Sequence, residues 1–253
     1  MARKTRPESF GNISDSEYDI LYTDHMCYGM KLDDHQYEYV MSILSTDKKI
    51  TFCEAPAGSG KTTLAFAGAL RLFNSGKYNG IIYMMAPYGE NRQGYLPGDI
   101  TEKSEVYFEP AYQAMIKCNL VPYQVVSNEP LCGDKQDGFI TLITNTFIRG
   151  TNFENKVVII DEAQNFTEHE LRTAISRIHD SCKVIIIGHT LQCDISSNKS
   201  GFEKCMSHFK CKHGDISDSV ELVNNYRGEI SKAADEPWEE TFSWYTIKEN
   251  LDL

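Results

Sequence analysis

The chain contains the stretch Ala55-Pro56-Ala57-Gly58-Ser59-Gly60-Lys61-Thr62, which follows the apolar run Ile50 to Cys53 and precedes a helical pattern from Thr62 to Phe73. A phosphate-binding loop requires this order of strand, glycine-rich loop and helix. Glycines at positions 58 and 60 let successive backbone N–H groups turn inward, and the helix start adds its positive dipole end. The stretch therefore predicts a nucleotide site in an α/β fold.

Two side chains at the end of this loop have distinct expected roles. Lys61 would reach the β- and γ-phosphates of ATP, and the Thr62 hydroxyl would ligate magnesium. Ala55 stands where the usual pattern has glycine, and alanine is small enough to fit there. The residues of this stretch expected to bind the nucleotide are Pro56, Ala57, Gly58, Ser59, Gly60, Lys61, Thr62 and Thr63.

A second motif follows the apolar run Val157 to Ile160, which ends in the carboxylates Asp161 and Glu162. On a buried strand that neighbours the strand of the phosphate loop, Asp161 can hold magnesium through water. Glu162 can then accept a proton from the attacking water. The two motifs together predict an ATPase that uses magnesium.

Short apolar runs alternate with helical patterns along the chain, which is typical of a mostly parallel sheet with helices on both faces. Thr167 and Glu170 have the spacing of a capping box, and Pro110 predicts a kink or a break in its helix. The expected strands are Ile50 to Cys53, Ile81 to Met85, Ile140 to Ile143, Val157 to Ile160, Val184 to Ile187 and Val220 to Val223. The expected helices are Thr62 to Phe73, about Thr101 to Lys117, and Glu168 to Ile178.

Charge and composition limit the classes of partner. The chain has 36 acidic and 25 basic residues among 253, and its formal net charge of −11 argues against broad coating of nucleic acid. A local basic groove stays open as an alternative. Polar residues follow the basic start, no apolar run approaches the ~20 residues of a membrane span, and the eight cysteines lack disulfide-like spacing. These features predict a soluble, cytoplasmic protein with reduced thiols and no membrane partner.

Composition also divides the chain into three parts: an N-terminal extension (1–32), an ATPase core (33–234) and an acidic C-terminal tail with interspersed aromatics (235–253). Two interpretations of the tail remain open, a strap packed on the core and a docking peptide for another protomer or protein.

A zinc site is a further alternative to a helix and turn with incidental thiols and imidazoles, although the spacing matches no common zinc motif. The residues with zinc-ligand chemistry are Cys193, Cys205, His208, Cys211 and His213.

Three more segments share their pattern and order with one known family: Gly94-Tyr-Leu-Pro-Gly-Asp99, Arg149-Gly150 and Asp161-Glu-Ala-Gln-Asn165. Together with the phosphate loop they resemble the PhoH-like P-loop ATPases, relatives of superfamily 1 helicase cores, over about residues 33 to 234. The resemblance implies a single RecA-like P-loop domain that binds ATP and magnesium. It also implies a homo-oligomeric ring, with a hexamer as one candidate size, and RNA or single-stranded DNA as candidate partners.

The resemblance implies roles for three residues outside the two motifs. Gln36 resembles the glutamine that reads adenine, and an ordinary surface glutamine is the alternative. Gln192 resembles a glutamine that senses the γ-phosphate or orients water. Arg227 resembles a helicase-type arginine near the γ-phosphate, acting in its own site or in a neighbour's.

Two departures from the family pattern bear on function. His189 follows Gly188 where the family usually has aspartate, so an expected carboxylate is missing and turnover could be slow. Ala86-Pro87 begins a shorter loop where the family commonly has Arg-Pro, and a contact to nucleic acid or to another protomer could be lost. The alternatives to an ATPase are an ATP-binding switch with little turnover and a small-molecule kinase, the latter disfavoured by the water-activating Glu162.

Overall fold

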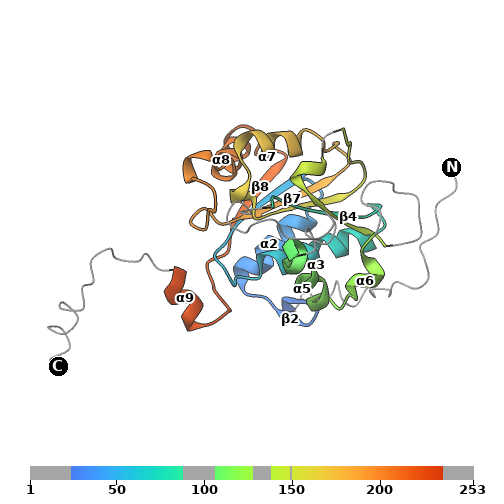
Figure 1. The fold of residues 1–253 in the computed structure, drawn as a ribbon. Helices are drawn as coiled ribbons and strands as arrows, with labels where there is room; N and C mark the ends of the chain where they lie inside the picture. The colour runs from blue at the N-terminus through green and yellow to red at the C-terminus, as the bar shows by residue number, and fades with distance from the viewer. Residues whose placement is uncertain (1–23, 88–105, 128–137, 149, 236–253) are drawn as a thin grey trace, which may run out of the picture.

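The computed structural model describes residues 24–87, 106–127, 138–148 and 150–235 (Figure 1). Three sequence features fall outside these ranges: the segment Gly94–Asp99, Arg149, and the tail beyond residue 235. The extension 1–32 is described only from Asp24, where Cys27 and Leu32 are buried in the core.

A six-stranded sheet in which all neighbouring strands run parallel forms the centre of the fold, with the order β5-β4-β6-β7-β3-β8. The prediction of a mostly parallel α/β sheet is confirmed. Its strands are β3 (Ile50–Glu54), β4 (Ile81–Met85), β5 (Ile140–Thr144), β6 (Val157–Asp161), β7 (Lys183–Gly188) and β8 (Ser217–Glu221). A separate two-stranded antiparallel sheet joins β1 (Met26–Cys27) and β2 (Met30–Lys31).

Helices cover both faces of the sheet, as predicted (Figure 1). One face carries α2 (Asp34–Leu44), α3 (Lys61–Asn74), α5 (Glu109–Lys117) and α6 (Pro122–Val125). The other face carries α7 (Glu168–Ile175) and α8 (Phe202–Lys212). The short helix α9 (Glu229–Asp235) lies apart from the sheet. Single 3₁₀ turns span Val106–Phe108, Asn145–Phe147, Ala163–Asn165 and Ser197–Lys199.

The apolar runs are continuous because both faces of each central strand are covered. In β6, Val157 and Ile159 pack into the core under α3, whereas Val158 and Ile160 pack into the core under α7 and α8. Side chains of a strand alternate between the two faces, so a strand between two helix layers needs an apolar residue at every position. This arrangement leaves only the strand ends for polar, functional residues.

Three elements differ from the prediction by more than one residue at an end. Strand β8 is Ser217–Glu221 rather than Val220 to Val223, because it pairs with β3 from Ile50↔Ser217 to Glu54↔Glu221. Pro110 marks a break rather than a kink, since α5 begins at Glu109 and a proline is tolerated in the first helical turn. The capping box of Thr167 and Glu170 is confirmed, but the helix that it starts ends at Ile175. Helices α2, α6 and α9 were not predicted from the sequence, whereas α8 covers most of the stretch for which a helix and turn was the alternative to a zinc site.

Candidate nucleotide-binding site

The phosphate loop connects β3 to α3 and has the shape of an anion cradle. Gly58 and Gly60 have φ values of 73° and 86°, in the left-handed region that glycine adopts without strain. Within the described ranges, the backbone N–H groups of residues 58–62 donate no hydrogen bond to the chain, and the buried Ser59 hydroxyl has no partner. Buried polar groups are normally paired, so these donors fit a bound phosphate.

The two acidic residues come from β6, which does not neighbour β3, because β7 lies between them. The expectation of an adjacent strand is therefore wrong, yet the carboxyl ends of all three strands still meet at one edge. Thr62 Oγ1 donates to Asp161 Oδ2 at 2.8 Å, which joins the two motifs directly. A hydroxyl beside a carboxylate offers the hard oxygen ligands that magnesium prefers, so these residues fit the ion.

Asp161 is fully buried and is held by a neighbour that the sequence did not indicate. Tyr83, from β4, donates its hydroxyl to Asp161 Oδ2 at 2.8 Å. Burial and the nearby Glu162 raise the pKa of Asp161 to about 6, while Lys61 and the hydrogen bonds from Tyr83 and Thr62 oppose this rise. Tyr83 thus helps to stabilise the charged form of this buried carboxylate.

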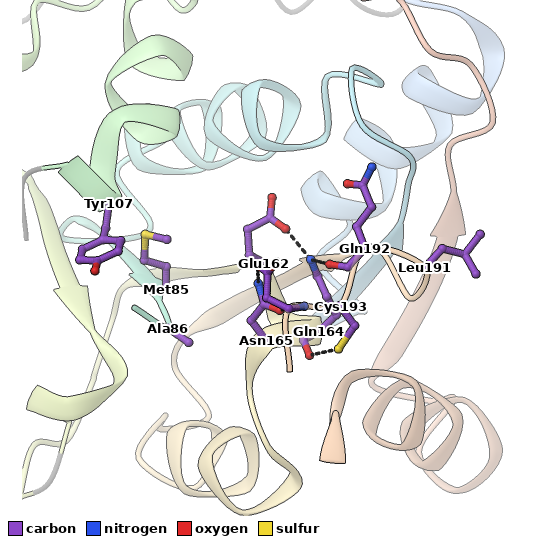
Figure 2. A pocket seen from close by; sticks show the side chains of 10 residues that line it. Met85, Ala86, Tyr107, Glu162, Gln164, Asn165, Leu191, Gln192 and Cys193 are labelled. Atoms are coloured by element: carbon purple, nitrogen blue, oxygen red, sulfur yellow. Dashed lines mark hydrogen bonds between the residues drawn. The ribbon is translucent and has the colours of Figure 1, made fainter. Parts of the chain in front are cut away.

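Glu162 adopts a left-handed backbone conformation with φ 49°, which is uncommon for a residue with a side chain. Its carboxylate lies 3.7 Å from Lys61 Nζ. It also lines a pocket of about 620 Å³ together with Met85, Tyr107 and Gln192 (Figure 2). The predicted base therefore faces both the phosphate loop and an open space for water or a partner.

Gln164 connects the acidic motif to the turn that carries Gln192, and the sequence analysis assigned it no role. Its Nε2 donates to Glu162 Oε2 at 2.6 Å and to the Gln192 carbonyl at 3.1 Å (Figure 2). Its Oε1 accepts from the His189 N–H at 3.0 Å. Gln164 is only 1% exposed, so these bonds fix the Glu162 carboxylate relative to the turn. Gly188 must lack a side chain here, because a Cβ would lie 2.9 Å from Gln164 Oε1.

Gln36 and Arg227 both lie at the phosphate loop. Gln36 Nε2 donates to the Ser59 carbonyl at 2.9 Å, and Gln36 Oε1 accepts from the Asp33 N–H at 3.2 Å. The Tyr226 N–H donates to the Gly58 carbonyl at 2.9 Å, which places Arg227 beside the loop of its own chain. The structure thus brings every predicted site residue to one edge of the sheet, with Gln36 beneath the loop rather than on the open surface.

The described residues bear on three further expectations: a zinc site, free thiols and the lack of a membrane span. In the described ranges no group of three or more His, Cys, Asp or Glu side chains could hold a metal ion, and the zinc candidates lie within those ranges. The seven cysteines in the described parts of the chain are free thiols. Among the described helices, none has the length and apolar character needed to cross a membrane.

The chain matches one protein family over most of its length. The sequence model of the family described as PhoH-like protein matches residues 30–233. A PhoH-like protein from Synechocystis sp. is 31% identical over 181 residues, which cover 71% of this chain and 52% of that relative. Protein PhoH from Escherichia coli (strain K12) is 30% identical over 180 residues, which cover 69% of this chain and 48% of the relative. The chain spans about half the length of the curated relatives it matches.

Among solved structures, the large terminase of bacteriophage HK97 superposes with a TM-score of 0.50 and 14% identity, over 88% of this chain and 47% of that one. This likeness concerns the fold alone. The chain therefore belongs to the PhoH-like protein family and has the RecA-like P-loop fold of a nucleotide-binding ATPase.

Proposed function

We propose that the protein binds ATP with magnesium and hydrolyses it, with Glu162 as the general base. The observation that carries this proposal is the meeting of unpaired loop N–H groups, Lys61, and the Thr62–Asp161 pair at one edge of the sheet. The N–H groups suit phosphate oxygens, and Glu162 lies beside them with its carboxylate toward open space.

Each residue of the site has a proposed role that follows from its position. Thr62 and Asp161 would hold a magnesium ion, whose charge would stabilise the phosphate oxygens during transfer to water. Lys61 would exchange its contact with Glu162 for the triphosphate, because a phosphate carries more charge than one carboxylate. Glu162, freed from Lys61 but still held by Gln164, would accept the proton of the attacking water. Gln192 would orient that water, and Arg227 would approach the γ-phosphate from its own chain.

The open wall beside Glu162 is where a partner would complete the site. A ring of identical copies would supply a second wall from the next protomer, and RNA or single-stranded DNA is the proposed ligand that hydrolysis would move. Both proposals rest on the family membership rather than on a contact within this chain.

The test is phosphate release from magnesium ATP by the wild type and by Glu162→Gln, each with and without single-stranded RNA. Removing a general base predicts a loss of at least about a hundredfold in rate with ATP binding retained. Glu203→Gln, an exposed carboxylate on α8, is the matched control and keeps the wild-type rate. If the wild type binds ATP but releases no phosphate, the proposal of an ATPase fails and a nucleotide-dependent switch takes its place.

A further inference from the structure

The turn that carries Gln192 is held by a carboxylate from another strand. Glu54 is the last residue of β3, directly before the phosphate loop. Its Oε1 accepts from the Thr190 N–H at 2.9 Å and from Thr190 Oγ1 at 2.6 Å. The turn itself is closed by the Gln192 N–H, which donates to the His189 carbonyl at 3.1 Å. The strand of the phosphate loop and the turn of Gln192 are therefore linked through one side chain.

Residue 189 occupies the first position of this turn, where a short carboxylate commonly accepts hydrogen bonds from backbone N–H groups of the turn itself. Here His189 fills the position, is largely buried, and has its Nδ1 3.8 Å from Glu54 Oε1. Within the described residues that nitrogen has no hydrogen-bond partner. The negative charge that stabilises the turn thus comes from β3 instead of from the turn.

Glu54 is suited to remain charged in this place. Burial raises the pKa of Glu54. The neighbouring His189 and the hydrogen bonds from Thr190 lower it by more, so that the pKa lies below the ordinary value. Charged acceptors make stronger hydrogen bonds than neutral ones, so the two bonds to Thr190 hold the turn firmly.

We propose that Glu54 is a positioning residue that sets Gln192 relative to Glu162. The turn is held on one side by Glu54 and on the other by Gln164, which also binds Glu162 Oε2. Without Glu54 the turn loses both bonds to Thr190 and keeps its contacts to Gln164 and, through Asp194, to Asn165, and Gln192 shifts away from the reacting water. The inference rests on the proposed hydrolysis of ATP.

The kinetic test compares Glu54→Ala with the double variant Glu54→Ala/His189→Asp. A misplacement of about 1 Å can reduce a rate by about a hundredfold, so we expect kcat to fall about tenfold to a hundredfold in Glu54→Ala. The KM for ATP should stay within about threefold, because the phosphate loop itself is unchanged. The double variant restores a carboxylate from within the turn and should recover most of the lost kcat.

The matched control is Glu221→Ala. Glu221 is the register partner of Glu54 on β8 and is exposed, so its removal deletes a carboxylate at the same level of the sheet without touching the turn. An equal loss of kcat in Glu221→Ala would show that the loss in Glu54→Ala comes from a general weakening of the sheet. That result would overturn the proposal. If Glu54→Ala does not fold, Thr190→Val can be used instead, because it deletes one of the two hydrogen bonds to Glu54. Its kcat should fall by a smaller factor.

A second readout does not require turnover. Cys193 follows Gln192 directly, and its Sγ contacts the Gln164 carbonyl at 3.2 Å. A displaced turn should raise the rate at which iodoacetamide labels Cys193, measured by peptide mass spectrometry against the exposed Cys211, and His189→Asp should reverse the increase. If the wild type releases no phosphate, the proposed function fails while this labelling still tests the position of the turn. Unchanged labelling of Cys193 in Glu54→Ala would overturn the inference.

Discussion

Arg227 lies against Gly58 of the same chain. A methyl group on Gly58 would lie 2.7 Å from Arg227 Cβ and 2.5 Å from the side-chain oxygen of Asn225, both closer than carbon can approach without displacing them. Asn225 Oδ1 also accepts from the Arg227 N–H at 2.8 Å. The phosphate loop and this distant segment therefore fit together only because residue 58 has no side chain, and the backbone of Arg227 lies beside the loop of its own chain.

Gly58→Ala should weaken ATP binding by about tenfold or more. The φ of 73° is strained for alanine by about 1–2 kcal/mol, and the added methyl group pushes away Asn225 and Arg227. Titration with a fluorescent ATP analogue measures the loss. Gly76→Ala is the matched control, because Gly76 has a φ of 75° and open space around it, so this variant shares the strain but should retain ATP affinity. Equal affinity loss in both variants would contradict the steric explanation.

Gln164→Met should lower kcat by about tenfold to a hundredfold and leave ATP affinity within about threefold. Methionine has similar length but lacks the amide that holds Glu162 Oε2 and the Gln192 carbonyl, so the base loses its fixed orientation. Phosphate release under saturating ATP gives kcat. Gln124→Met, at an exposed position on α6, provides the comparison and should behave as wild type. An unaltered kcat in Gln164→Met would exclude this role.

Gln36→Ala should weaken the binding of ATP and of GTP by similar factors. Both ends of the Gln36 amide are bonded within the chain, to the Ser59 carbonyl and to the Asp33 N–H, so its removal loosens the phosphate loop. Competition titrations with the two nucleotides measure the ratio. A loss confined to ATP would instead favour the adenine-reading role that the family resemblance implies.

Lys183→Met should destabilise the fold by about 2–3 kcal/mol near pH 7, because it leaves buried carbonyl groups without their donor. Lys183 Nζ, buried at the start of β7, donates to the carbonyls of Ser42, Ser45 and Lys48. Unfolding in urea measures the free-energy difference between wild type and variant.

The wild type and Lys183→Met also test how the free energy of unfolding depends on pH. Burial lowers the pKa of Lys183 to about 7, below that of an exposed lysine. Between about pH 7 and 10 the unfolded chain therefore binds more protons than the folded chain, and wild-type stability rises with pH. The advantage of wild type over Lys183→Met should grow by at most about 1.4 kcal/mol per pH unit above pH 7 and be constant well below it. A difference that stays flat up to pH 9 would show that Lys183 remains charged when buried.

Local patterns predicted the parts of the site that lie next to each other in the sequence. The apolar run Val157 to Ile160 indicates a strand covered on both faces, and the polar residues directly after it must lie at the edge of the sheet. The same reasoning applies to the loop after β3. The positions of Lys61, Thr62 and Asp161 at this edge could therefore be predicted from sequence, because each position depends on one strand end and the direction of the chain.

Contacts that depend on strand order could not be predicted. Nothing in the spacing of residues indicates that β7 lies between β3 and β6, and this insertion is what brings Glu54 and Gln164 to the same turn. Strand β8 was misplaced for a related reason. It is an edge strand that begins with Ser217, Asp218 and Ser219, so its position comes from pairing with β3 rather than from an apolar pattern.

The strand order also determines when the site can exist during synthesis. Strand β3 pairs only with β7 and β8 among the described strands, and these follow it by more than a hundred residues. A nascent chain that ends before Lys183 holds the complete glycine-rich loop but has no neighbouring strand to support it. Pairing over such sequence separation is slow, because a long loop must close first. The ability to bind ATP would thus appear late in synthesis, once the central sheet is complete.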